Sequence, residues 1–208
     1  MTHDASIAGV IEDSRTLELA RETLARGGVV VLPTDTLFGF SAKLSAEDAI
    51  TRISAIKHAS TDRRYIVLAS SIEMVDRCVQ SYGCSTREAL AARWPAPLSV
   101  ILPSGPSLPA WVGPTVAVRV PALEALRSLI EQVGEPIVST SVNRSGQDPF
   151  GDVHDIRREF STEVDLIVTG EVPGGVSSTL VDLCGKAPRV VRDGAYAWTS
   201  AGAGKPSK

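Results

Sequence analysis

Short apolar runs recur along the chain and are separated by polar or amphipathic stretches. The runs are rich in valine, isoleucine and leucine, and several end at proline or glycine, as VVVLP does at residues 29–33. Short apolar, β-branched runs bounded by turn residues are typical of buried strands. We therefore predict strands at residues 29–33, 65–69, 98–103, 115–121, 136–142, 164–170, 178–183 and 189–194.

The stretches between these runs carry apolar residues at helical spacing. In SAEDAITRISAIK, residues 45–57, four apolar side chains from Ala49 to Ile56 fall on one face. A stripe that repeats every three to four residues predicts an amphipathic helix. The same reasoning predicts helices at residues 14–28, 45–57, 70–80, 85–94, 122–134 and 152–160.

Serine and glycine mark where several of these helices should begin and end. Ser14, Ser45 and Ser85 stand where a side-chain oxygen would cap a helix start. Glycine adopts the left-handed conformation that stops a helix, so we expect stops at 27–28 and at Gly134.

Helices and strands alternate early in the chain, whereas strands crowd together later. This order predicts an α/β fold with a sheet of mixed direction instead of a purely parallel, doubly wound one. We expect one domain over residues 1–196. Residues 197–208, which include SAGAGKPSK, should form a disordered tail because they are small and polar.

Composition adds that the protein should be soluble and cytoplasmic. Its 208 residues are 43% hydrophobic and 22% charged, with a net charge of -3, which gives no general reason to bind nucleic acid or membranes. The N-terminus does not have the pattern of a signal peptide, and no apolar run approaches the ~20 residues that span a bilayer. Three cysteines without C-x-x-C spacing suggest free thiols in a reducing compartment.

Polar and cationic residues gather where predicted strands end. The segments are LPTDT, TVAVRVP, IVSTSVNRSG, GGVSSTLVDL and RVVRDG. Ligand crevices of α/β sheets form at such ends, and hydroxyls with arginines suit an anionic ligand. Taken singly, each residue has another reading: the hydroxyls as turn formers, Arg119 as a structural ion pair, and Lys57 as a partner of a helix dipole.

The common nucleotide and hydrolase signatures do not occur in the sequence. AGAGKPS lacks the spacing of a phosphate-binding P-loop, and no G-x-G-x-x-G follows a strand. His3, His58 and His154 are too scattered for a metal site or a Ser-His triad. Asp35 could assist chemistry, although an aspartate after Pro-Thr is more often a turn residue. A side-chain nucleophile is therefore disfavoured, and we predict no protein metal site.

Taken together, the ordered elements resemble the YrdC-type threonylcarbamoyl-AMP synthases. The elements are GGVVVLPTDTLFGFSAK, ISAIKHASTDRRYIVLAS, RWPAPLSVIL, VAVRVP, PIVSTSVNRSGQDP, SSTLVDL and RVVRDGA. They resemble, in order, that family's P-T-[DE]-T, I-K-x-R, W-P-G-P, A-V-R-x-P, S-T-S-A-N-x-S-G, S-T-[IV]-[VI]-D and R-x-G elements. The similarity runs from about residue 15 to 195.

The resemblance implies a YrdC-like twisted mixed sheet with flanking helices around a deep, positively charged cavity, in the short single-domain form. It implies the condensation of L-threonine, bicarbonate and ATP into threonylcarbamoyl-adenylate with release of pyrophosphate. A separate transferase complex, met transiently, then modifies tRNA. Mg²⁺ would accompany the ATP, because no carboxylate cluster is visible in the sequence.

The resemblance also implies roles for individual residues, carried over position by position. Lys57 and Arg119 would be the catalytic residues, through charge and positioning. L-threonine would contact Thr34, Arg119, Ser139 and Thr179. ATP would contact Lys57, Arg64, Thr115, Ser141, Asn143 and Arg192.

One departure bears on activity. The arginine of the I-K-x-R element is replaced by Ala59, and Arg63 or Arg64 is our hypothesis for its substitute. Losing one charge-assisted phosphate contact costs ~1.5–3 kcal/mol, about ten- to a hundredfold in binding.

Three alternatives stay open at this point. The first is a YrdC-like RNA-binding or ribosome-assembly factor. The second is a carbamoyl-adenylate-forming relative of the kind found within longer hydrogenase-maturation proteins. The third is a paralogue that binds nucleotide without turnover.

Overall fold

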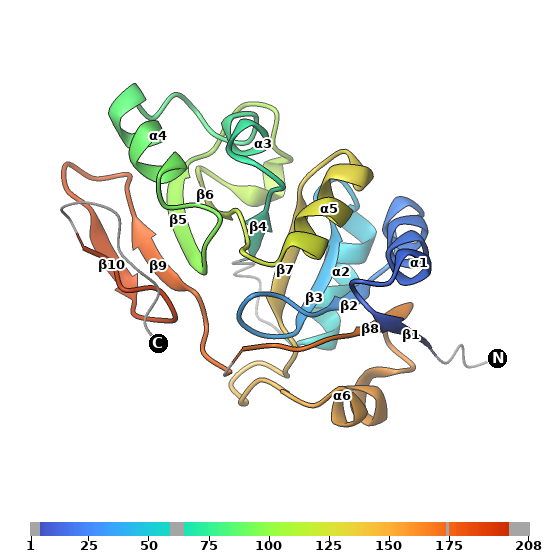
Figure 1. The fold of residues 1–208 in the computed structure, drawn as a ribbon. Helices are drawn as coiled ribbons and strands as arrows, with labels where there is room; N and C mark the ends of the chain where they lie inside the picture. The colour runs from blue at the N-terminus through green and yellow to red at the C-terminus, as the bar shows by residue number, and fades with distance from the viewer. Residues whose placement is uncertain (1–4, 59–64, 174, 200–208) are drawn as a thin grey trace.

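A ten-stranded sheet organises the computed structural model, which describes residues 5–58, 65–173 and 175–199. Its spatial order is β1-β8-β2-β3-β7-β4-β6-β5-β9-β10 (Figure 1). The strands are β1 (Ser6–Val10), β2 (Val30–Leu32), β3 (Gly39–Lys43), β4 (Ile66–Leu68), β5 (Leu98–Pro103), β6 (Thr115–Arg119), β7 (Ile137–Ser141), β8 (Leu166–Thr169), β9 (Thr179–Asp182) and β10 (Arg189–Arg192).

The sheet has mixed direction, which confirms the predicted class. β8 pairs in parallel with both β1 and β2, and β6 and β9 are parallel to β4 and β5, respectively. The remaining neighbours, including β3 between β2 and β7, are antiparallel. Sequence-distant strands are therefore brought side by side, so that segments from both halves of the chain meet along the middle of the sheet.

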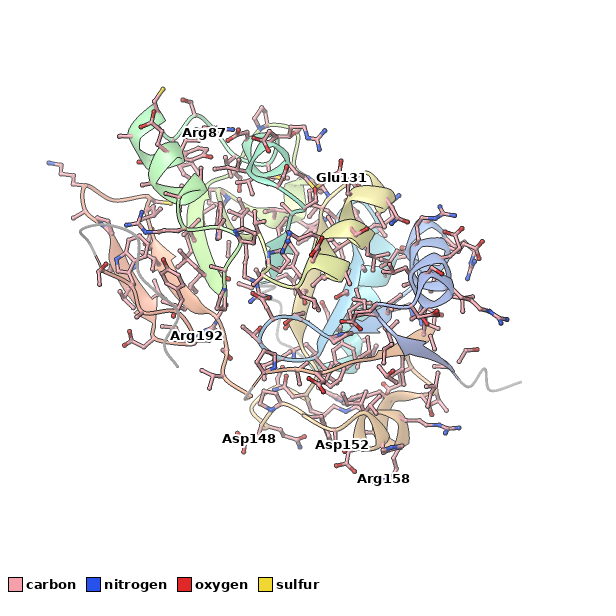
Figure 2. The ribbon with its side chains drawn as sticks, in the orientation of Figure 1. Arg87, Glu131, Asp148, Asp152, Arg158 and Arg192 are labelled. Atoms are coloured by element: carbon pink, nitrogen blue, oxygen red, sulfur yellow. The ribbon has the colours of Figure 1, made fainter. Side chains whose placement is uncertain are left out.

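Helices cover the sheet, with α1 and α5 side by side over its β1–β3 side (Figure 1). Charged side chains such as Arg87, Asp152 and Arg158 lie at the periphery of the molecule (Figure 2). The helices are α1 (Ser14–Ala25), α2 (Glu47–Ile56), α3 (Ile72–Asp76), α4 (Cys84–Ala91), α5 (Glu124–Val133), α6 (Val153–Phe160) and the short 3₁₀ helix η1 (Ala110–Val112).

Aromatic packing joins α6 to the sheet. The ring of Phe160 in α6 meets Phe40 of β3 edge to face at 5.0 Å, and Phe150 in the same geometry at 5.5 Å. Phe40 and Phe160 are fully buried. Burying side chains of this size stabilises a fold by roughly 1.5–3 kcal/mol each.

The predicted helix stops are confirmed, but the predicted serine caps are wrong. Gly27 and Gly134 follow α1 and α5 with φ near +80°. Asp13, not Ser14, caps α1 by accepting the Thr16 N–H at 2.9 Å. Ser45 instead donates its hydroxyl to Glu135 at 2.8 Å. The predicted cap Ser85 lies inside α4, whose start has no side-chain cap.

Two strands were not anticipated. β3 reads GFSAK, a sequence of low strand propensity, yet it is almost completely buried between β2 and β7. Its pairing on both sides overrides local preference. β1 is an edge strand with mostly exposed side chains, so it gives little apolar signal.

The described residues bear on two further expectations. Cys78, Cys84 and Cys184 are free thiols, and burial raises the pKa of Cys78 to about 11. None of the helices in the described ranges has the length and apolarity needed to cross a bilayer. The predicted tail lies largely outside the description, because residues 200–208 are not covered, and so it stays a prediction.

Candidate active site

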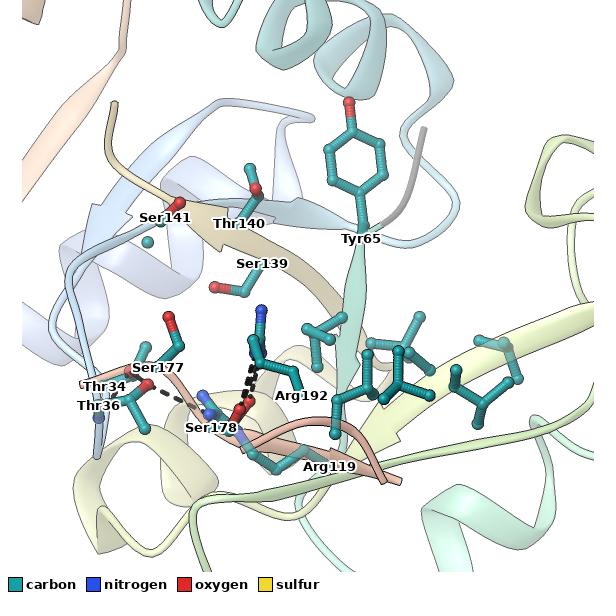
Figure 3. A pocket seen from close by; sticks show the side chains of 18 of the residues that line it. Thr34, Thr36, Tyr65, Arg119, Ser139, Thr140, Ser141, Ser177, Ser178 and Arg192 are labelled. Atoms are coloured by element: carbon teal, nitrogen blue, oxygen red, sulfur yellow. Dashed lines mark hydrogen bonds between the residues drawn. The ribbon is translucent and has the colours of Figure 1, made fainter. Parts of the chain in front are cut away.

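A cavity of about 1020 Å³ opens where β3, β4, β6 and β7 face the segment before β9 (Figure 3). Its polar lining is mostly hydroxyl groups and two guanidinium groups. The described residues with polar or aromatic side chains in this lining are Thr34, Thr36, Phe38, Tyr65, Trp111, Thr115, Arg119, Ser139, Thr140, Ser141, Ser177, Ser178 and Arg192.

The turn after β2 is folded by the hydroxyl of Thr34. Its Oγ1 accepts the N–H groups of Thr36 at 3.1 Å and Leu37 at 3.2 Å, and it lies 2.7 Å from the Leu37 carbonyl oxygen, to which it can donate. Thr34 is buried. A hydroxyl that bonds its own backbone two or three residues on fixes such turns. The abrupt change from VVVL to PTDT therefore builds a rigid corner at the cavity wall.

This corner fixes Arg119, the last residue of β6. One guanidinium nitrogen donates to Thr36 Oγ1 at 3.2 Å, and the other lies 3.4 Å from Asp35 Oδ1. Asp35 is itself held, because its Oδ2 accepts the Ala122 N–H at 2.8 Å. Arg119 is only 3% exposed, and its Nε has no hydrogen-bond partner among the described residues. The guanidinium thus keeps unused donors in a desolvated setting.

Burial lowers the pKa of Arg119, whereas the Asp35 carboxylate raises it and the nearby Arg192 lowers it. Arginine stays protonated at any working pH because its ordinary pKa exceeds 12. A buried cation opposed by a single carboxylate is stabilised further by an anionic ligand.

Arg192 enters the cavity from β10 and is held by the segment before β9. Its Nε and one terminal nitrogen donate to the Ser178 carbonyl oxygen at 3.1 and 2.9 Å (Figure 3). The Ser178 hydroxyl lies 2.9 Å from that of Ser99 on β5. A Cβ at Gly194 would collide with the backbone of Ser177–Thr179, so only glycine lets the two segments approach so closely.

A second polar cluster lies behind Ser141 at the C-terminus of α2. Lys57 Nζ donates to the Ser141 carbonyl at 2.7 Å and to Asn143, at its carbonyl oxygen (3.1 Å) and at Oδ1 (2.6 Å). The Ser141 hydroxyl donates to the same Oδ1 at 2.7 Å. Burial lowers the pKa of Lys57 to about 8. All three ammonium protons are thus used on neutral oxygens, with no carboxylate among these partners.

Residues 22–194 match the Sua5/YciO/YrdC family model, which is described as telomere recombination. The chain belongs to the Sua5/YciO/YrdC family. It is 31% identical over 172 residues to a threonylcarbamoyl-AMP synthase of Marinobacter nauticus, covering 80% of this chain and 90% of the relative.

Solved structures of the Sua5/YciO/YrdC family share the fold. P. abyssi Sua5 complexed with L-threonine superposes with a TM-score of 0.86 at 29% identity, covering 92% of this chain and 58% of that one. The present chain therefore spans less than two thirds of that Sua5. E. coli YciO gives a TM-score of 0.83 at 25% identity over 91% of this chain and 96% of its own. The family and the fold class predicted from the sequence are confirmed.

Against this family background, the structure brings together most of the predicted site residues. Thr34, Thr115, Arg119, Ser139, Ser141 and Arg192 line the cavity. Their individual roles stay predictions. The positive charge of the cavity also stays a prediction, since Asp35 pairs with Arg119 just behind the wall.

Three further predicted residues lie outside this lining, and a fourth is not described. Lys57 and Asn143 sit behind the wall, one hydrogen bond from Ser141. Thr179 is fully buried, and its hydroxyl donates to the Tyr196 carbonyl at 2.6 Å and accepts the Tyr196 N–H at 3.1 Å. Arg64, with Ala59 and Arg63, lies outside the described residues.

Sequence reasoning missed the aromatic part of the wall. The sequence predicts only a buried strand at Tyr65, and Trp111 falls in the connection between β5 and β6, LPAWVGP, whose composition predicts only a loop. Thr36 and Ser177 were also missed as individual residues, although both stand inside quoted motifs. A motif indicates which segments matter, but not which of their side chains reach the cavity.

Proposed function

We propose that this chain is an L-threonylcarbamoyladenylate synthase, a nucleotidyltransferase of the tRNA threonylcarbamoyladenosine route. The observation that carries the proposal is Arg119, a nearly fully buried guanidinium with unused donors on the wall of a hydroxyl-lined cavity. Relatives with about 30% identity are named threonylcarbamoyl-AMP synthases, which supports the same activity. Their names do not favour the RNA-binding alternative.

The reaction needs no protein nucleophile, in keeping with the groups that line the cavity. The neutral threonine amine attacks the carbon of bicarbonate, and loss of one water molecule leaves a carbamate. A carbamate oxygen then attacks the α-phosphorus of ATP, and the bond to the β-phosphate oxygen breaks to release pyrophosphate. Binding in one desolvated cavity supplies proximity, and fixed donors stabilise the developing charge.

Each reactant has a matching part of the wall. Arg119 suits the threonine carboxylate, since a planar guanidinium holds carboxylates in bidentate fashion. The hydroxyls of Thr34 and Ser139 lie on the same wall and suit the amino-acid substrate. Thr115, Ser141 and Arg192 suit the nucleotide.

Lys57 would meet the phosphates only after exchanging a carbonyl partner for a phosphate oxygen. The exchange is favourable because an ammonium binds an anionic oxygen more strongly than a neutral carbonyl. Asn143 would then hold the remaining Lys57 proton. Arg64 is our proposed substitute for the cation missing at Ala59.

Mg²⁺ is proposed to enter with ATP and to neutralise phosphate charge. Among the described residues no group of three or more His, Cys, Asp or Glu side chains is placed to cage a metal ion. The proposed magnesium ion would therefore be held mainly by phosphate oxygens and water. Bicarbonate is the remaining substrate, and the proposed setting is the cytoplasm, with transient transfer of product to the tRNA-modifying transferase.

Pyrophosphate release tests the proposal. Purified protein with ATP, Mg²⁺ and bicarbonate should release pyrophosphate only when L-threonine is present. Arg119→Ala should lose at least about a hundredfold in kcat/KM, because one charged contact contributes about 1.5–3 kcal/mol and its removal also leaves Asp35 unpaired. Arg158→Ala, which removes an exposed arginine paired with Asp155, is the matched control and should keep full activity.

Bound ATP without threonine-dependent release would contradict the synthase and favour the binding-only paralogue. Equal activity in Arg119→Ala would contradict the assignment of the carboxylate site.

A further inference from the structure

The three tryptophans of the chain differ in how their rings are held. Trp94 is 8% exposed, and its Nε1 donates to the Leu98 carbonyl at 2.8 Å. Trp198 stacks on Arg93 at 5.0 Å. Trp111 lines the cavity, and its Nε1 makes no hydrogen bond within the described part of the chain. A tryptophan kept for packing usually satisfies its N–H, so this ring calls for another explanation.

The segment that carries Trp111 is rigid. Helix η1 lies between Pro109 and Pro114, whose rings fix the backbone φ angle. The Val112 N–H donates to the Pro109 carbonyl at 3.0 Å, and the Ser104 N–H donates to the Pro114 carbonyl at 3.0 Å. Trp111 is therefore presented to the cavity by a backbone that needs little ordering when a ligand binds.

Tyr65 packs against the indole of Trp111. The two ring centroids lie 6.1 Å apart with the planes at 76°, an edge-to-face contact. The Tyr65 hydroxyl lies 2.6 Å from Ser54 Oγ on α2, so this ring is also fixed. Edge-to-face packing covers at most one face of the indole and leaves the other for a further aromatic partner.

The aromatic and cationic parts of the cavity lie apart. Figure 3 shows Tyr65 on one side, and Arg119 and Arg192 with Ser178 on the other. Arg119 and Arg192 are the charged side chains among the described lining residues. A cavity with this polarity fits a ligand that has a flat aromatic part at one end and anionic groups at the other.

We propose that Trp111, backed by Tyr65, is the platform on which the nucleobase of the bound nucleotide stacks. The inference rests on the proposed function, which supplies ATP as the ligand. Stacking accepts any base with a π face, so Trp111 contributes affinity for the adenosine half, whereas Arg192 on the cationic side holds the phosphates. Thr115, at the start of β6, lies four residues further on and lines the same wall.

Calorimetric titration with two probes tests this division. Mg·ATP carries the base, and Mg·tripolyphosphate carries only the phosphate chain. Trp111→Ala should weaken ATP about ten- to a hundredfold, the range for losing one base-stacking contact, and leave tripolyphosphate within about twofold. Trp111→Phe keeps a π face and should stay within about fivefold of the unsubstituted protein for ATP. Trp198→Phe is the matched control, with both affinities unchanged.

Intrinsic fluorescence gives a second readout. ATP should quench tryptophan emission in the unsubstituted protein and in Trp198→Phe, but not in Trp111→Phe. Unchanged ATP affinity in Trp111→Ala, or an equal loss for both probes, would overturn the platform while leaving the synthase in place. No ATP binding by the unsubstituted protein would overturn the proposed function and the platform with it.

Discussion

Lys57 Nζ and Asn143 Oδ1 lie 2.6 Å apart, although 86 residues of sequence separate them. The contact joins the C-terminus of α2 to the loop after β7. It is reinforced by the Ser145 N–H, which donates to the Lys57 carbonyl at 2.8 Å. The ammonium group of Lys57 is therefore buried close to the cavity, where it contacts the lining residue Ser141.

The affinity for ATP should depend on the charge of Lys57. Burial lowers the pKa of Lys57 to about 8, so the ammonium is present below that pH and is lost above it. The ATP dissociation constant should therefore increase by up to about tenfold per pH unit above pH 8. Lys57→Arg stays charged and should show no such alkaline loss in calorimetric titrations from pH 7 to 9.5. A parallel loss in both proteins would contradict the role of Lys57.

Stability should follow the opposite trend with pH. The folded-state pKa of Lys57 lies below its unfolded value of about 10.5, so between these values the unfolded chain binds more protons. The contribution of Lys57 to the free energy of unfolding therefore rises from pH 8 to above pH 10, by on the order of 3 kcal/mol. Urea unfolding of the unsubstituted protein and of Lys57→Met should be measured from pH 7 to above pH 10. The difference between the two free energies of unfolding at each pH gives the contribution of Lys57.

Asp35→Asn should destabilise the fold by about 3 kcal/mol, because it leaves the buried Arg119 without its carboxylate. The exposed Asp148, which lies on the outside of the molecule, provides the control Asp148→Asn (Figure 2). Urea unfolding should show a lower midpoint for the first variant only. Equal midpoints would mean that solvent already screens Arg119.

Thr179→Val should lose about 1–3 kcal/mol of stability, since it leaves the buried N–H and carbonyl of Tyr196 without the hydroxyl. Thr179→Ser keeps both bonds and should restore most of the loss. The same pair tests the predicted threonine contact. If the KM for threonine rises in Thr179→Val but not in Thr179→Ser, that contact is supported.

Gly194→Ala should lower stability by about 1–3 kcal/mol, because its Cβ would press into the backbone of Ser177–Thr179. Displacing Ser178 would also release Arg192, so ATP binding should weaken in step. Gly151→Ala adds a methyl group in open space and should change neither quantity. Thermal unfolding and ATP titration of both variants check the prediction.

The sequence predicts the elements that carry their own hydrophobic signal. β5 has the bounds expected from LSVILP, residues 98–103. The central strand β3 could not be predicted, because Gly39, Ser41 and Ala42 have little preference for strands. A larger residue in place of Gly39 would also require the Ser139 hydroxyl on β7 to rotate away, because the two would otherwise overlap.

The site divides in the same way. Arg119 and Thr34 stand in motifs whose residue types already indicate anion binding, and both line the cavity. The orientation of Thr179 depends on its hydrogen bond to the Tyr196 carbonyl, a contact between distant residues that the local sequence pattern does not encode. Trp111 lines the cavity because the connection between β5 and β6, which carries it, forms part of the cavity wall.

The strand order also determines when the molecule can take shape during synthesis. β1 hydrogen-bonds to β8 in the described sheet, and β8 also forms the flank of β2. A chain emerging from the ribosome therefore presents β1 and one side of β2 long before their partner exists. Because β10, with Arg192, is made later still, a nascent chain cannot complete its cationic wall until translation of the domain is nearly finished.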